Sequence, residues 1–311
     1  MDSNVIAKKR WQAGQVTTEP WPELQLAAWQ DTYATLHMWT QMAGKIRLEL
    51  TPLINHWWEV PLYVNARGLT TSAIPWGDEI FEIQFDFIDH KLVIATSWGA
   101  SRSLALKPQS VADFYAAFMS ALHSLGIEVK IWSTPCEVPD PIRFEDDREH
   151  ASFDQEYVHR FWKILIACHN VFTEFRARFI GKDSPVHFFW GSFDLCVTRF
   201  SGRRAPERPG ADRVTREAYS HEVISAGFWP GAGYKNAAFY AYAAPEPPGF
   251  ADQEIKPAKA FYEPQLKEFI LMYDDVRTAV SPREALLEFL ESTYEAGAKL
   301  AGWNRNELER I

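Results

Sequence analysis

The stretch IFEIQFDFIDHKLVIATSW, residues 80–98, decides the fold class. In residues 80–87 apolar side chains alternate with Glu82, Gln84 and Asp86. A period of two is typical of a β-strand that buries one face. A polar turn at 88–91 separates this strand from a second apolar run at 92–98. The stretch therefore predicts an antiparallel pair of strands with one face in the core.

Helices and further strands surround this pair. Apolar residues recur at helical spacing between Pro22 and Leu48, which predicts one long helix or two short ones. Another helix is predicted from Ser110, its N-cap, to Gly126, which ends it in the left-handed conformation. Additional strands are predicted at 59–67, 103–106 and 128–132.

The second half of the chain has the same mixture of elements. A helix is predicted over 152–181, where Ser152 and Gln155 form a capping box. Another is predicted over 281–303, with Ser281 as its cap. Strands are predicted at 184–198, 220–229 and 237–245, and a strand or a helix-to-strand element at 268–277. The whole pattern predicts an α+β fold, with an antiparallel sheet or sheets and long helices packed on one side.

Proline and acidic residues dominate the stretch TPCEVPDPIRFEDD, 134–147, which is typical of an extended connector. We therefore divide the chain into an N-terminal tail (1–20), a first α+β half (21–134), a connector (135–151) and a second α+β half (152–311). The two halves also fit one continuous domain. Each half runs from a long helix through strands to a Ser-capped helix. A weak internal duplication of about 130–150 residues per unit explains this order, and so does coincidental α+β patterning; both explanations stay open.

Composition excludes several classes of function. The 311 residues include 41 acidic and 32 basic side chains, a net charge of −9. A nucleic-acid or anionic-membrane surface needs a basic field, so neither partner is expected. No apolar run approaches the roughly 20 residues that span a bilayer, and no secretory signal is recognised. The cysteines lack paired spacing, which favours reduced thiols in a cytoplasmic protein and no zinc motif: Cys136, Cys168 and Cys196.

Candidate site residues gather in SPVHFFWGSFDLCVTRFSGRRAP, residues 184–206. Alternation along one strand places Ser192 and Asp194 in a row from Trp190 to Thr198, with His187 on the opposite face. Trp and Cys are poor choices for a solvent-facing row. We therefore expect this row to be covered by another element and its polar groups to be satisfied by partners or by a ligand.

Charged residues follow this row. Arg199 and Arg203 lie around Gly202, and arginine forks bind carboxylate or phosphate groups. A solvated turn, with each arginine paired to a surface acid, is the alternative. His221 and Glu222 are adjacent, so on a strand they point to opposite faces.

Local motifs for metal or phosphate chemistry are absent from the sequence. It contains no HExxH, Walker A, GxGxxG or GxSxG pattern. A metal site would need tertiary convergence of histidines and acids distant in sequence, and none is predicted: His56, His90, His187 and His221 with Asp86, Asp89, Asp194 and Glu222.

Several long aromatic-rich strings resemble an uncharacterised family of bacterial proteins, known only as a domain of unknown function. They include NHWWEVPLYVNARGLTTSAIP, HFFWGSFDLCVTRFSGRRAP and SHEVISAGFWPG. The resemblance runs from Trp21 to about Glu307. It implies a soluble bacterial protein that is a single module of about 300 residues. It implies no activity, substrate or catalytic residue, and no cofactor is identified.

Two hypotheses of different class follow. The first is a pocket protein, either a small-molecule binder or a metal-independent acid/base enzyme, whose arginines hold an anionic group. Its predicted catalytic residues are His187, His221, Asp194 and Glu222. Its predicted ligand-binding residues are Trp57, Trp58, Arg67, Trp190, Ser192, Arg199, Arg203 and Trp229. The second is a scaffold or interaction protein, in which the aromatic strings form the core and the interface of a homo-oligomer.

Overall fold

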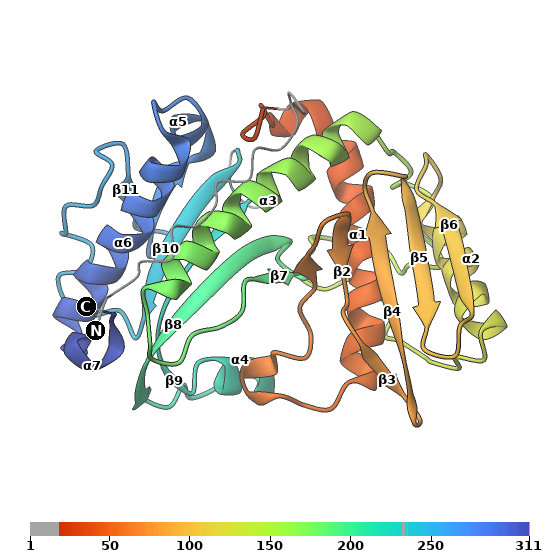
Figure 1. Ribbon diagram of the computed structural model, residues 1–311, viewed down its shortest axis with the longest axis horizontal. Helices are drawn as coiled ribbons and strands as arrows, with labels where there is room; N and C mark the ends of the chain where they lie inside the picture. The colour runs from red at the N-terminus through yellow and green to blue at the C-terminus, as the bar shows by residue number, and fades with distance from the viewer. Residues whose placement is uncertain (1–18, 232–233, 235, 311) are drawn as a thin grey trace, which may run out of the picture.

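The computed structural model describes residues 19–231, 234 and 236–310 (Figure 1). The predicted tail, 1–20, lies almost wholly outside these residues. Two antiparallel sheets and several long helices confirm the predicted α+β class. Among the described residues, none of the helices has the length and apolar character needed to cross a membrane.

The first sheet has the strand order β1-β2-β4-β5-β6, and β3 pairs with β4. Its strands are β1 (Tyr63–Val64), β2 (Gly68–Thr70), β3 (Ile74–Trp76), β4 (Glu79–Asp86), β5 (Lys91–Thr96) and β6 (Ser101–Ala105). The central pair, β4 and β5, is the one predicted from the alternating stretch. Phe81, Ile83 and Phe85 are buried as the alternation requires.

The second sheet has the order β11-β12-β10-β9-β8-β7. Its strands are β7 (His187–Phe189), β8 (Asp194–Arg204), β9 (His221–Trp229), β10 (Ala238–Ala244), β11 (Phe261–Glu263) and β12 (Glu268–Met272). The two sheets meet beside β1 and β7, where Leu62 and Phe188 exchange backbone hydrogen bonds of 2.8 and 2.9 Å. In each sheet the chain therefore begins at this join; in the second sheet it moves outward from β7 to β10, continues to the edge strand β11 and returns to β12. The internal duplication remains a prediction.

Two of the helices, α3 and α6, cover one face of the second sheet. The helices are α1 (Leu26–Leu50), α2 (Val111–Ser124), α3 (Gln155–Ala177), α4 (Arg213–Ala218), α5 (Tyr273–Arg277), α6 (Pro282–Leu300) and α7 (Arg305–Leu308), with a 3-10 turn, η1, at Asn55–Trp57. α3 packs on β8, and α6 packs on β9 and β10 (Figure 1). α1 packs against α2 and α3, and its Trp39 stacks on Phe114 at 4.3 Å. These contacts leave the opposite face of the second sheet for other elements to cover.

Three local predictions are wrong. Residues 128–132 form no strand. Asp194 does not continue a strand from Ser184, because residues 190–193 form a turn in which Phe193 has φ 56°. The cap of α3 is Asp154, whose carboxylate accepts from the N–H groups of Glu156 and Tyr157. The caps predicted for α2 and α6, Ser110 and Ser281, are confirmed.

The turn at 190–193 changes which side chains share a face. It makes β7 and β8 an antiparallel hairpin in which His187 is opposite Cys196 and Phe189 is opposite Asp194. Opposed residues of an antiparallel pair project to the same side. His187 therefore lies on the same face as Asp194, and the predicted separation of these two residues onto opposite faces is wrong.

Candidate functional site

The face of the second sheet that α3 and α6 do not cover is lined by polar and aromatic side chains. On β8, Leu195, Val197 and Arg199 point to the helices, so Asp194 and Thr198 point away from them. The pairing of β8 with β9 and of β9 with β10 assigns the side chains of those strands to the same two sides of the sheet. The residues on the uncovered side include Asp194, Cys196, Thr198, Ser225, Gly227, Tyr240 and Tyr242.

A cavity of about 210 Å³ lies over this face. Its floor is formed by β8, β9 and β10, and its roof by His56, Trp58, Ala218 and Tyr219. The roof is held together by the His56 ring, whose Nδ1 lies 3.2 Å from the carbonyl oxygen of Ala218. η1 and α4, which are far apart in sequence, therefore close one side of the cavity together.

Hydrogen bonds fix the polar groups of the floor. The hydroxyls of Ser192 and Tyr240 both donate to the carboxyl group of Asp194. The Tyr240 ring also stacks on Trp229, with 4.3 Å between ring centroids. Gly227 makes this arrangement possible, because a Cβ there would lie 2.6 Å from Cε1 of Tyr240. Asp194 is 4% exposed and is thus a buried acid with neutral hydrogen-bond donors.

A second cavity, of about 420 Å³, adjoins the first at Ser192, which lines both. Its lining comes from segments distant in sequence: Tyr33 and His37 from α1, Glu137 from the segment between α2 and α3, and Trp229 from the end of β9. We call the two cavities together the central cleft.

Burial shifts the pKa values of the acids around the cleft. It raises the pKa of Asp194, although the hydroxyls of Ser192 and Tyr240 oppose the shift. Burial, followed by the negative charge of Asp194, raises the pKa of Glu137 and brings that of Glu268 to about 7. The site therefore holds carboxyl groups that exchange protons closer to neutral pH than ordinary acids do.

Burial shifts the pKa values of the nearby histidines in the opposite direction. It lowers the pKa of His37 to about 4, although the carbonyl oxygens of Gly191 and Trp190 favour the charged ring. It lowers the pKa of His187 to about 3, with Arg47 and Arg176 adding to the shift. The Nε2 atom of His187 is buried without a hydrogen-bond partner. Both rings are neutral at physiological pH.

Four of the predicted site residues meet in the central cleft. Trp58, Ser192 and Asp194 line the smaller cavity, and Trp229 and Ser192 line the larger. Asp194 is the one predicted proton-transfer residue among them. His187 shares its face of the sheet but packs between the rings of Trp58 and Tyr63.

The predicted arginines lie elsewhere and are already paired. Arg67 binds Asp86 and Asp89 in the first sheet. Arg199 lies on the helix side of β8, where its guanidinium stacks on Phe175 and approaches Glu291 at 3.5 Å. Arg203 binds Glu222 at 2.7 Å, which places that predicted proton-transfer group in a surface ion pair.

The other predicted residues also point away from the cleft. Trp190 packs on Gly44 and donates from Nε1 to the carbonyl oxygen of Val60 at 2.8 Å. The Trp57 ring lies under the guanidinium of Arg213. His221 packs edge-on against His56 outside the cavity roof. The structure thus separates the residues predicted from the aromatic strings into a cleft group and a structural group.

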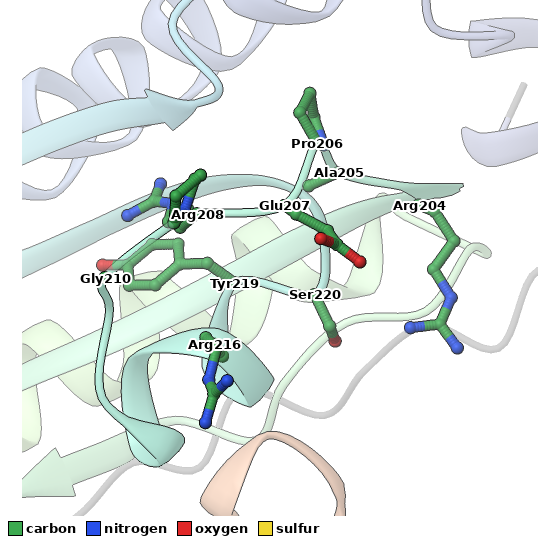
Figure 2. Close-up of a pocket in the computed structure, with 10 residues that line it drawn as sticks. Arg204, Ala205, Pro206, Glu207, Arg208, Gly210, Arg216, Tyr219 and Ser220 are labelled. Atoms are coloured by element: carbon green, nitrogen blue, oxygen red, sulfur yellow. The ribbon is translucent and has the colours of Figure 1, made fainter.

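A surface hollow of about 640 Å³ lies beside α4, on the polar loop that follows β8. Figure 2 shows three arginines around it, with their guanidinium groups pointing away from one another: Arg204, Arg208 and Arg216. Arg208 stacks on Tyr219 at 4.1 Å. These groups do not converge on one anion as a binding fork would.

Several cleft residues were not predicted from the sequence. Tyr240 and Tyr242 alternate in β10, so the period of two would have placed them on one face. Tyr33 and Glu137 belong to the first half and the connector, and they reach the second sheet only through tertiary packing. Within residues 19–231, 234 and 236–310, no three His, Cys, Asp or Glu side chains are grouped to hold a metal ion.

The chain belongs to a family of unknown function, DUF5996, whose model matches residues 21–310. This match confirms the resemblance to an uncharacterised family of about 300 residues. No curated protein and no solved structure matched the chain. The bacterial origin and the cytoplasmic location stay predictions.

Proposed function

We propose that this protein binds a small molecule in the central cleft, and that the cavity over Asp194 recognises one end of that molecule. Ligand sites are commonly concave, mostly aromatic or apolar, and supplied with a few fixed polar groups. The central cleft has these properties, and its lining comes from segments distant in sequence.

Asp194 carries this proposal. A carboxyl group that is 4% exposed costs stability unless hydrogen bonds or charges compensate it. Its donors are the hydroxyls of Ser192 and Tyr240, which leave it in contact with the cavity. A protein that needed only a packed core would gain stability from an apolar residue at this position. We infer that Asp194 is retained for contact with a bound molecule.

Asp194 is also the group through which acid/base chemistry would take place. Burial raises its pKa above that of an ordinary Asp, which is the direction of shift that favours a carboxyl group as a general acid. Recognition of an anionic group by Arg67, Arg199 or Arg203 is no longer part of the proposal, because each of these arginines has its own carboxylate partner away from the cleft.

The scaffold alternative has one observation in its favour. Phe188 and Phe193, from the aromatic strings, are fully buried in the main core. This role does not compete with the cleft, because Asp194 and Thr198 of the same strings face the opposite side of the sheet. Core formation therefore explains part of these strings, and ligand binding explains the rest.

A thermal-shift screen of a small-molecule library tests the proposal. We expect compounds that raise the melting temperature of the wild-type protein and have no effect on Ser225→Leu, which fills the smaller cavity. Asp194→Asn should remove or weaken the same shifts. The matched control is Asp86→Asn, which changes another buried Asp, 3% exposed, far from the cleft. A screen whose hits shift all variants equally would disprove the proposed site.

A further inference from the structure

Three carboxyl groups lie in or beside the central cleft, and each comes from a different part of the chain. Asp194 begins β8 and lines the smaller cavity, Glu137 belongs to the connector and lines the larger, and Glu268 begins β12. Ser192 connects two of them, because it lines both cavities and its hydroxyl binds Asp194, while Glu137 lies on the side of the larger cavity. Each of the two cavities therefore has a carboxyl group in its wall.

The backbone is shaped to bring Glu137 to this position. Glu137 has φ 56°, a left-handed conformation that residues other than glycine rarely adopt. Its carboxyl group lies against Gly191, where an added Cβ would be 2.5 Å from Oε1. A larger residue at position 191 would push this carboxyl group away from Ser192 and Asp194.

None of the three acids has a cationic partner in the described part of the chain. The ion pairs there do not include Asp194, Glu137 or Glu268, whereas buried Asp86 pairs with Arg67 at 2.6 Å. The Oε2 atom of Glu268 is buried without any hydrogen-bond partner. Buried carboxylates without a counter-charge are costly, so a bound cation would relieve a real electrostatic penalty.

Aromatic faces complete the cleft. The stacked pair of Trp229 and Tyr240 and the ring of Tyr33 adjoin the acids. Trp58, Tyr219 and Tyr242 surround the smaller cavity. Aromatic faces attract organic cations, most strongly where water is excluded. Carboxyl groups next to aromatic walls are therefore the chemistry that recognises an ammonium group on an apolar body.

We propose that the ligand of the central cleft is a small organic cation, an amine or quaternary ammonium compound. Its charged nitrogen would lie between Asp194 and Glu137, with Glu268 beside the cleft, and its apolar part along Trp229 and Tyr33. This inference rests on the proposed function, since it names the ligand class of the same site.

A matched set of probes tests the ligand class by isothermal titration calorimetry. The probes are phenethylamine, phenyltrimethylammonium, 2-phenylethanol and 3-phenylpropionate, which share a phenyl group and differ in charge. They accompany a thermal-shift library with equal numbers of cationic, neutral and anionic fragments. We expect the two cations to bind at least about tenfold more tightly than the alcohol, and the anion to bind least.

Variants assign the effect to the cleft. Asp194→Asn should weaken cation binding about tenfold and leave alcohol binding within about twofold. Glu137→Gln provides the same test if the Asp194 variant does not fold. Asp86→Asn should leave both affinities unchanged. If the cleft binds neutral compounds, anions or divalent metal ions as tightly as organic cations, the proposed ligand class is wrong, although small-molecule binding in the cleft would still stand. A library without any cleft hit would contradict the proposed function and the ligand class together.

Lys235 lies outside the described residues, so the test includes Lys235→Met. If the ligand supplies the positive charge, this variant should bind phenethylamine as tightly as the wild type or more tightly. If cation binding appears only in Lys235→Met, the chain's own lysine is the counter-charge, and the proposal is wrong.

Discussion

Replacing Gly227 with alanine tests how the floor of the central cleft is built. The new Cβ would lie 2.6 Å from Cε1 of Tyr240, a ring held by its stack on Trp229 and its hydrogen bond to Asp194. The ring must move by about 1 Å, and such overpacking costs about 1–3 kcal/mol. If the movement breaks the bond to Asp194, a further ~1.5–3 kcal/mol is lost.

We therefore expect Gly227→Ala to lower the free energy of unfolding by about 3 kcal/mol in urea titrations. It should also weaken any ligand that contacts Asp194. The matched control is Gly297→Ala, on the opposite side of the same sheet, where the new Cβ meets the terminal Cδ1 methyl of Ile224 at 2.9 Å. That methyl can rotate away, and alanine favours the helix, so the control should change stability by less than about 1 kcal/mol. Equal effects of the two substitutions would refute this account of Gly227.

The remaining predictions concern acid stability, alkaline stability and the buried arginine. The pKa of His187 is about 3 in the folded protein, below its ordinary value of 6.5, so its contribution to stability is lost as the pH falls below 6.5. Between pH 7 and pH 4, the free energy of unfolding of His187→Phe should therefore fall by about 3 kcal/mol less than that of the wild type. Trp58→Phe replaces a neighbour without a titratable group, so its free energy of unfolding should fall as much as that of the wild type. An equal fall in His187→Phe and the wild type would contradict this prediction. The pKa of Glu268 is about 7, above its ordinary 4.5, so its contribution is present in acid and is lost as the pH rises from 4.5 to 7. Glu268→Gln should remove up to about 3 kcal/mol of that loss in unfolding experiments at pH 5 and pH 8, and an unchanged pH dependence would show that Glu268 is not shifted. Arg199→Met should lower the free energy of unfolding by about 2–4 kcal/mol, because it removes a buried cation from Glu291 and Phe175, and it should leave ligand affinity unchanged; loss of binding at full stability would return Arg199 to the site.

The fold class could be predicted from periodicity, because alternation in β4 and helical spacing in α1 are local properties of the sequence. The hairpin of β7 and β8 could not. Its turn places Phe193 in the left-handed region without the Asn-Gly or Asp-Gly signal of a tight turn. Missing this turn reversed the predicted face of His187.

Cleft residues that belong to a single strand could be predicted from the sequence, whereas residues brought to the cleft by tertiary packing could not. Alternation along β8 identified Asp194, and the same rule places Arg199 on the helix side, whereas Ser192 reaches the cleft from the turn before the strand. Its charge is typical of an anion-binding residue, but the place of Arg199 on the helix side of β8 pairs it with Glu291 instead. Glu137 and Tyr33 reach the cleft because the two halves pack together, and no local pattern in the sequence records that contact.

A crystal structure of the protein with a hit from the thermal-shift screen shows directly where the ligand binds. We expect density for the ligand in the central cleft, in contact with the carboxyl group of Asp194 and the ring of Trp229. Density in the surface hollow beside α4, or at any place where Asp194 is not contacted, would contradict the account.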